Sequence, residues 1–255
     1  MGEWKDLGYK LKQYFNFTPA ELRGLAVSIL VVAFIISFAD WGKGETPDAA
    51  AGLFNLLIAI IITAITFFVR ESARRVAALS VGYRAEYKVW LWGLLIGLVV
   101  VFVSRGYVWL LLPGGILLHH LAGHRLGHFR YGLNFFGLGM VSMVAPIANL
   151  VLAVIIKIVN AYLQLDVLTK ALYLNLLLAI FSVLPIPPMD GSKMFFGSRM
   201  VYSFMFAAII LASVLLFLDI PIWVSVLGSF VGAVVCWLLY YIYFERFAWE
   251  KGPYP

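Results

Sequence analysis

Long apolar runs separated by short charged segments dominate the sequence from residue 22 onward. Six of these runs approach the roughly 20 residues that an α-helix needs to cross the hydrocarbon core of a bilayer. The predicted spans are Leu22–Ala39, Gly52–Val69, Leu138–Val159, Ala171–Leu184, Met200–Leu218 and Ile222–Phe244. A further apolar stretch, Val89–Leu118, is interrupted at Arg105-Gly106, and we interpret it as a hairpin or re-entrant element because each half is short for a crossing. The pattern predicts an all-α polytopic membrane protein with about six transmembrane helices.

The first 21 residues have a different pattern, in which apolar side chains recur at helical spacing among lysines. These apolar positions are Trp4, Leu7, Leu11 and Phe15. We expect a short amphipathic helix that lies on the membrane surface. Thr18-Pro19-Ala20-Glu21 then predicts the start of a new helix with a capping box. The chain is therefore divided into an amphipathic segment, residues 1–21, and a single membrane domain, residues 22–255.

The composition independently excludes a soluble protein. Hydrophobic residues make up 63% of the chain and charged residues 13%, whereas an ordinary globular domain has about 45–50% and about 25%. We therefore expect the lipid bilayer to be the solvent of this protein. The one cysteine, Cys236, lies in an apolar run, and we expect it to be buried and inert. The net charge of +6 is interpreted as lysine and arginine at the cytoplasmic face rather than as affinity for nucleic acid.

The distribution of charge predicts the orientation of the chain in the membrane. The segment 40–48 is acidic, whereas basic residues gather near residues 5–23, 70–88, 125–130, 193–199 and 246–251. If Val89–Leu118 makes no net crossing, all the basic segments lie on one side. The positive-inside rule makes that side cytoplasmic. We expect an integral protein of the cell membrane with both termini in the cytoplasm.

One candidate site lies in the stretch Leu184–Gly191, at the end of a predicted span. Three prolines within four residues prevent a helix from continuing, so we expect an extended segment that presents backbone groups and Asp190 near membrane depth. A carboxylate at that depth is costly and is therefore a functional candidate. The alternative is a helix that ends at the prolines, with Asp190 in an aqueous loop.

A second candidate lies where the apolar run ending at Val69 meets charged residues. Arg70 and Arg74 are four residues apart and share one face of a helix. Glu71 can pair with Arg74 or Arg75 at spacings of three and four residues. The alternative is an arginine cluster at the cytoplasmic end of a span, with side chains that extend to the interface.

A third candidate consists of the histidines, since all four in the chain lie between His119 and His128. His120, His124 and His128 recur every four residues and would form one stripe on a helix, where neutral imidazoles bind transition metals. Glycines between them weaken a helix, and nearby arginines repel a cation. The alternative is a polar loop at the membrane interface.

Taken in order, these segments resemble the site-2 protease family of intramembrane zinc metalloproteases. The stretch Leu184–Gly191 is similar to the family signature Pro-x-Pro-x-Leu-Asp-Gly, with Met189 in place of leucine, and Met143–Asn149 is similar to its Ala-Gly-Pro-x-x-Asn segment. The resemblance covers about residues 50–200 and implies a site-2-protease-like core. The positions to which it gives a structural role are Asn149, Asn175, Pro185, Pro187 and Gly191.

The sequence departs from the family at its His-Glu-x-x-His motif, which corresponds here to Arg70-Glu71-Ser72-Ala73-Arg74. The resemblance implies that Glu71 occupies the position of the general base and Asp190 that of the third zinc ligand. Ser182 stands where the family has an asparagine before its proline signature. Both histidine positions are arginine, and a guanidinium has no lone pair to offer zinc and does not deprotonate in proteins. We therefore expect no cofactor at this site and no proteolysis through it.

The two arginines replace the positive charge that zinc would supply to the carboxylates. We expect Arg70 or Arg74 to pair with Asp190 in an ion-pair network that holds the fold together. The resulting hypothesis is a proteolytically inactive site-2-protease-like protein that binds or regulates transmembrane segments of client proteins. One alternative is an active intramembrane zinc metallopeptidase with a relocated metal site built from His120, His124 and His128. Another is a metal or haem carrier that uses the same histidines.

Overall fold

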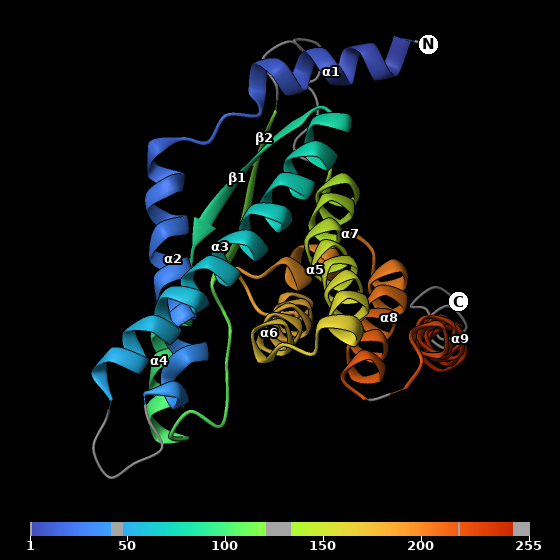
Figure 1. The fold of residues 1–255 in the computed structure, drawn as a ribbon. Helices are drawn as coiled ribbons and strands as arrows, with labels where there is room; N and C mark the ends of the chain where they lie inside the picture. The colour runs from blue at the N-terminus through green and yellow to red at the C-terminus, as the bar shows by residue number, and fades with distance from the viewer. Residues whose placement is uncertain (1, 42–47, 121–133, 219, 247–255) are drawn as a thin grey trace.

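The computed structural model describes residues 2–41, 48–120, 134–218 and 220–246. The elements in chain order are α1 (Gly2–Tyr14), α2 (Pro19–Ser37), η1 (Phe38–Asp40), α3 (Ala49–Ser80), β1 (Tyr83–Val89), α4 (Leu91–Val103), β2 (Gly114–His120), α5 (Phe135–Leu163), α6 (Asp166–Ser182), α7 (Asp190–Gly197), α8 (Arg199–Phe217), α9 (Ile222–Tyr240) and η2 (Tyr241–Glu245). In Figure 1, α3 runs diagonally through the molecule, with α2 and α4 on one side and α5 to α9 on the other.

Five of the described helical segments are long and apolar enough to cross a membrane. They are Pro19–Asp40, Ala49–Ser80, Phe135–Leu163, Arg199–Phe217 and Ile222–Glu245. Each contains or overlaps a span that the sequence predicts, so the protein is an integral membrane protein. The remaining predicted span, Ala171–Leu184, falls on α6, which has 17 residues. A helix of that length reaches roughly 26 Å and lies at the short end of what spans a bilayer.

The protein is mostly helical, as predicted, but the segments before and after α4 form two short strands that were not predicted from the sequence. Strands β1 and β2 form a two-stranded antiparallel sheet in which Tyr83 pairs with His120 and Val89 with Gly114. The chain therefore leaves the sheet, passes through the 13-residue helix α4 and returns to the same level, as the predicted hairpin requires. The second half of the hairpin is extended rather than helical, because Pro113 and the positive φ of Gly114 break a helix.

The N-terminal segment forms the predicted helix α1, which lies above the upper end of α3 in Figure 1 and is joined to α2 by a short linker. Helix α2 begins as predicted, with a capping box in which the Thr18 side chain accepts from the Glu21 amide and Glu21 accepts from the Thr18 amide, both at 3.3 Å. Two orphan amides at the start of the helix are thereby satisfied within the protein.

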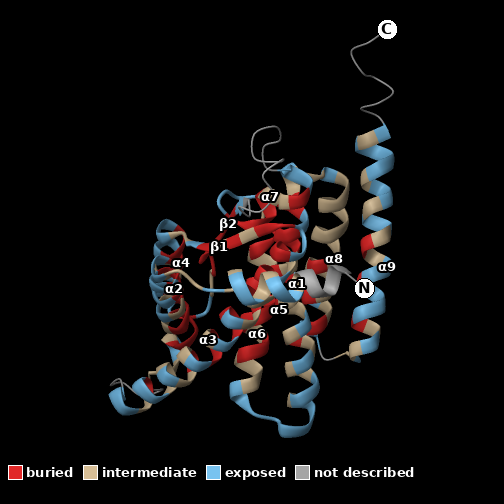
Figure 2. Cartoon of the chain, turned by 90° about the horizontal axis from the view of Figure 1, so that it is seen from above, coloured by how far each residue is buried: buried red, intermediate tan, exposed pale blue. Residues whose placement is uncertain are grey.

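The buried residues concentrate on the sheet and on the faces of α3, α5 and α6 that point inward (Figure 2). Helix α9 lies at the edge of the molecule beside α8, and most of its surface is exposed in Figure 2. Cys236 on α9 is exposed, so the prediction that it is buried is wrong. In a membrane protein an apolar run is no sign of burial inside the protein, because lipid solvates the outer faces.

Hydrogen bonds of Tyr87 hold strand β1 against the neighbouring elements. Its hydroxyl lies 2.7 Å from the Ser28 hydroxyl on α2 and donates to the Pro113 carbonyl at 2.8 Å. Its backbone amide donates to the carboxylate of Glu21 at 2.8 Å. Because these contacts are buried, they hold the sheet against α2 with polar groups that have few competing water partners.

Replacing Tyr87 with phenylalanine should make the free energy of unfolding less sensitive to alkaline pH. Burial raises the pKa of Tyr87 above its ordinary value of 10. The folded protein keeps the phenolic proton at pH values where the unfolded chain has lost it, so this stabilisation is complete below about pH 10 and is lost as the pH rises further. Thermal unfolding in detergent, followed by circular dichroism, should show a steeper loss above about pH 10 for the wild type than for Tyr87→Phe. Parallel curves for the two proteins would contradict this assignment.

Candidate functional site

The site begins with one face of helix α3. Arg70 and Arg74 lie one turn apart on this continuous helix, and neither side chain has accessible surface. Glu71 is 3% exposed at its side chain and lies beside them. The alternative in which these arginines extend to the membrane interface is therefore wrong. These charged side chains are buried because each has an oppositely charged partner inside the protein.

Asp190 is the partner that both arginines share. Its Oδ2 accepts from Nη2 of Arg70 at 3.0 Å and also from Nη2 of Arg74. Arg74 additionally donates through Nη1 to Glu71 at 2.6 Å, and Nε of Arg70 lies 3.7 Å from the same Glu71 oxygen. The sequence places Asp190 at least 116 residues away from these arginines, and the fold brings them together. The predicted ion pair is present with both arginines.

Asp190 is held in place by the turn that precedes it. It is the first residue of α7, where a carboxylate is favourable beside the unpaired amides of a helix start. The expectation of an extended segment here is wrong, because Ile186 donates to the Leu184 carbonyl at 2.8 Å and Met189 to the Ile186 carbonyl at 2.7 Å. Pro185 and Pro187 lie exposed on this folded turn, whereas Asp190 is fully buried. The alternative of an aqueous Asp190 is therefore also wrong.

Two glycines let the proline turn pack closely. A Cβ on Gly191 would lie 2.2 Å from the Val183 carbonyl oxygen and 2.4 Å from that of Leu184. A Cβ on Gly115 of strand β2 would lie 2.3 Å from the Pro188 carbonyl oxygen. The turn is thus fixed against the end of α6 on one side and against the sheet on the other, which determines where Asp190 points.

Replacing Gly191 with alanine should lower the free energy of unfolding by about 1–3 kcal/mol, because the added methyl group must displace backbone. The matched control is Gly8→Ala in α1, where an added Cβ meets nothing within 4 Å. That substitution should be neutral or slightly stabilising. Thermal unfolding of the two variants in the same detergent compares them directly. Equal midpoints would show that the turn tolerates the methyl group and does not fix Asp190.

The four ionised side chains of the cluster carry two positive and two negative charges, which balance. Balance matters because an unpaired charge buried in protein costs several kcal/mol. The pairing leaves four polar atoms without hydrogen-bond partners among the described residues, namely Nε and Nη1 of Arg70, Nε of Arg74 and Oδ1 of Asp190. Lys193 on α7 borders the cluster and donates to the Pro188 carbonyl at 3.1 Å. Burial lowers the pKa of Lys193, and the nearby Asp190 carboxylate opposes that shift.

The cluster does not suit zinc. Positions 70 and 74 present guanidiniums, which cannot coordinate a metal, and the carboxylate oxygens that face them already accept from N–H groups. Among the residues that the structure describes, no three histidine, cysteine, aspartate or glutamate side chains come together as a metal site. The chemistry available at this cluster is therefore anchoring by charge-assisted hydrogen bonds.

The asparagines with predicted structural roles lie buried in helices near this region. Asn175 of α6 donates through Nδ2 to the Thr66 hydroxyl of α3 at 3.1 Å, one turn before Arg70. Asn149 of α5 is 1% exposed, and neither its Nδ2 nor its Oδ1 has a partner among the described residues. Asn175 thus joins α6 to α3 beside the cluster, and the structure adds Thr66 as its partner.

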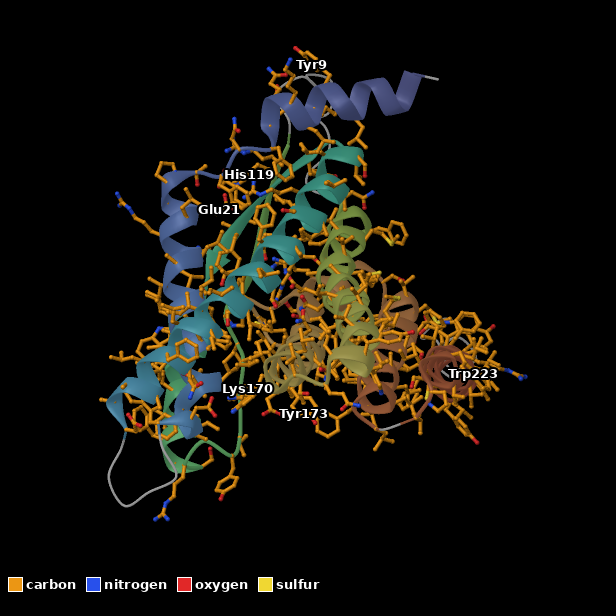
Figure 3. All side chains as sticks on the ribbon, in the orientation of Figure 1. Tyr9, Glu21, His119, Lys170, Tyr173 and Trp223 are labelled. Atoms are coloured by element: carbon orange, nitrogen blue, oxygen red, sulfur yellow. The ribbon has the colours of Figure 1, made fainter. Side chains whose placement is uncertain are left out.

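Only part of the histidine cluster can be placed. His119 and His120 belong to strand β2, so a helical stripe that begins at His120 does not form. His119, labelled in Figure 3, lies 3.5 Å from the Glu86 carboxylate across the sheet. His124 and His128 lie outside the described residues.

A second buried ion pair lies near the site and was not predicted. Arg75 donates through Nη2 to Glu21, and its guanidinium lies 3.8 Å from the centre of the Phe17 ring. The same Glu21 oxygen accepts from the Tyr87 amide. The capping-box motif identified Glu21 but gave it only a local role. A long-range partner on α3 has no signal in a single sequence.

The chain is similar to a curated protein from an archaeon. The two proteins are 25% identical over 184 residues, which is 70% of this chain and 85% of the relative. That protein, from Methanocaldococcus jannaschii, carries the name "Putative zinc metalloprotease". No protein-family model matches the chain. No solved structure matches it.

Proposed function

We propose that this protein is a site-2-protease-like integral membrane protein that has lost zinc-dependent proteolysis and binds transmembrane segments of client proteins. The observation that carries the proposal is the shared hydrogen bonding of Arg70 and Arg74 to Asp190. In the metalloprotease-like site that the resemblance implies, these three positions are zinc ligands. Here the same positions, together with Glu71, form a charge-balanced cluster. Without a metal, no bound water is activated, and Glu71 has no nucleophile to generate.

A groove between α2 and α3 supports the binding of a transmembrane segment. It has a volume of about 450 Å³ and is lined only by apolar and aromatic side chains, among them Ala26 of α2 and Phe68 of α3. Phe68 stands two residues before Arg70, so the groove is near the cluster along the axis of α3 but on another face of that helix. Apolar side chains of a client helix would pack into this apolar groove. In this proposal the C-terminal end of α3, which carries Arg70 and Arg74, and both termini of the chain lie on the cytoplasmic side, because the basic residues gather there.

The relative's name favours a second candidate, an intramembrane zinc metallopeptidase. Such an enzyme requires at least three ligands outside the Arg70–Asp190 cluster. It would draw on His124 and His128, which the described structure does not include, and on a carboxylate such as Glu86, which already faces His119.

Two measurements on the wild-type protein, purified in detergent without a histidine tag, separate these candidates. Elemental analysis should find zinc well below one equivalent, and transmembrane peptides should remain intact after incubation. A photo-crosslinking residue at Ala26 should capture client transmembrane helices in full-length form, whereas one at Val27, exposed on the same helix outside the groove, should not. Stoichiometric zinc that is lost in His124→Ala, together with cleaved peptides, would establish the metallopeptidase instead.

A further inference from the structure

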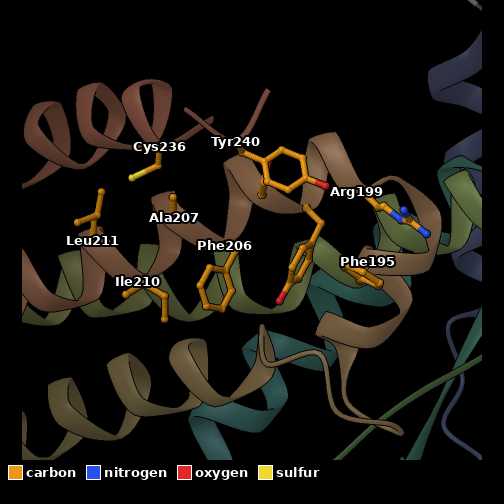
Figure 4. A pocket seen from close by; sticks show the side chains of 10 residues that line it. Phe195, Arg199, Phe206, Ala207, Ile210, Leu211, Cys236 and Tyr240 are labelled. Atoms are coloured by element: carbon orange, nitrogen blue, oxygen red, sulfur yellow. The ribbon is translucent and has the colours of Figure 1, made fainter. Parts of the chain in front are cut away.

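A second apolar groove lies between helices α8 and α9, away from the charged cluster. Figure 4 shows this groove from close by, with side chains of both helices around it. Its volume is about 440 Å³, and its apolar lining includes Phe206, Ile210 and Leu211 of α8 and Cys236 and Tyr240 of α9. The site that we assign to client segments does not use it. Helix α9 lies at the edge of the molecule in Figure 2, where we expect the bilayer to surround it.

One end of this groove carries a positive charge. Arg199 is the first residue of α8, is exposed, and lies with its guanidinium carbon 5.8 Å from the centre of the Phe195 ring. No carboxylate of the described residues forms an ion pair with Arg199. Figure 4 places Arg199 at one end and Leu211 and Cys236 toward the other. The helical rise from Arg199 to Ile210 gives the groove a length of roughly 16 Å.

The shape of the groove limits what can occupy it. One turn of an α-helix, about 10–12 Å across and 5.4 Å long, already fills roughly 500 Å³. The groove therefore cannot enclose a transmembrane helix and admits only side chains of one, as the groove between α2 and α3 does, whereas a thin, flexible hydrocarbon chain fits inside it. A cation at one end of an apolar channel complements an anionic headgroup attached to such a chain. Tyrosines such as Tyr240 are typical of the headgroup level of a membrane, where their rings are amphipathic.

We propose that the groove binds one anionic phospholipid, with its phosphate at Arg199 and an acyl chain between α8 and α9. The lipid would fill the space between the two helices and cover part of the exposed surface of α9. This site is independent of the Arg70–Asp190 cluster. Its presence or absence therefore does not depend on whether the protein binds client helices.

Cys236 provides the test, because it lines the groove and is the only cysteine in the chain. The full-length protein in detergent is treated with N-ethylmaleimide, and the rate of alkylation is read from the intact mass. Added phosphatidylglycerol should slow this rate at a concentration about fivefold lower than phosphatidylcholine, which is the difference expected for one arginine on an anionic headgroup. Arg199→Gln should remove the difference and Arg199→Lys should keep most of it.

The matched control is Arg23→Gln, which removes an exposed arginine from α2 and should leave the preference unchanged. Inorganic phosphate alone should not protect Cys236, because it has no chain to fill the groove. Equal protection by both lipids, or a preference that survives Arg199→Gln, would overturn the proposal. Protection by inorganic phosphate would also overturn it, since the site would then bind a free anion rather than a lipid.

Discussion

Replacing Arg74 with methionine should lower the free energy of unfolding by about 3–5 kcal/mol, which is the usual cost of removing one partner from a buried ion pair. Arg74 bridges Asp190 and Glu71, and all three side chains are buried. After the substitution, the positive charge of Arg70 alone faces two carboxylates. The excess negative charge has no water to solvate it, so it must be neutralised or the fold must open. The unfolding midpoint in detergent, followed by circular dichroism, measures the loss.

A second substitution shows whether charge or packing causes this loss. In Arg74→Met/Glu71→Gln one positive and one negative charge remain, so the double variant should recover more than half of the lost stability. Arg84→Met serves as the control, because Arg84 pairs with Glu86 at 3.4 Å where both side chains are about one-third exposed. That pair should contribute less than about 1 kcal/mol. If Arg74→Met costs no more than Arg84→Met, the buried cluster does not hold the fold together.

The local features of this site follow from the sequence, because they depend on neighbouring residues. The four-residue spacing of Arg70 and Arg74 predicts their common face, whereas the pairing of Asp190 with an arginine was expected only from the resemblance to the zinc metalloproteases. The capping box at the start of α2 was likewise predicted from the sequence. The pairing of Arg75 with Glu21 was not predicted, since each residue already has a sufficient local explanation. Only the packing of α2 against α3 selects this pair.

The two-stranded sheet was missed although its first strand has a clear pattern. From Tyr83 to Val89 apolar side chains alternate with charged ones, and the strand buries Tyr83, Ala85 and Tyr87. A period of two residues indicates a half-buried strand. The basic residues of this segment were used only to predict its side of the membrane. Charge counting gives the side of the membrane but says nothing about backbone conformation.

The proline segment was assigned the wrong conformation for a related reason. Prolines exclude a helix, but they do not require an extended chain when neighbouring residues can donate backbone hydrogen bonds that close turns. The amides of Ile186 and Met189 lie between and after the prolines and close two tight turns. Gly191 then allows the folded turn to sit directly on the end of α6. The sequence predicted that Asp190 is functional, while the turn that buries it depends on contacts with α6 and β2.

Replacing both Arg70 and Arg74 with histidine should create a zinc site that binds close to one equivalent of metal. This prediction rests on the proposed relation to the zinc metalloproteases. Both positions face Asp190, and an imidazole with a metal bound at about 2.0–2.1 Å spans a distance similar to that of a guanidinium. Zinc also supplies two positive charges, which replace the two that the substitutions remove. The balance with Glu71 and Asp190 is therefore kept.

Without metal, the double variant should be destabilised as Arg74→Met is, because its two carboxylates lose their partners. Zinc at 100 times its dissociation constant should then raise the free energy of unfolding by about 2.7 kcal/mol, and a chelator should reverse the gain. Adding Asp190→Asn should abolish zinc binding, whereas Arg75→His alone should bind none, since position 75 faces Glu21 instead. A zinc-dependent rise that persists without Asp190 would place the metal elsewhere. A double variant that folds normally but binds no zinc would show that the cluster was never arranged as a metal site, and the proposed origin of its arginines would be wrong.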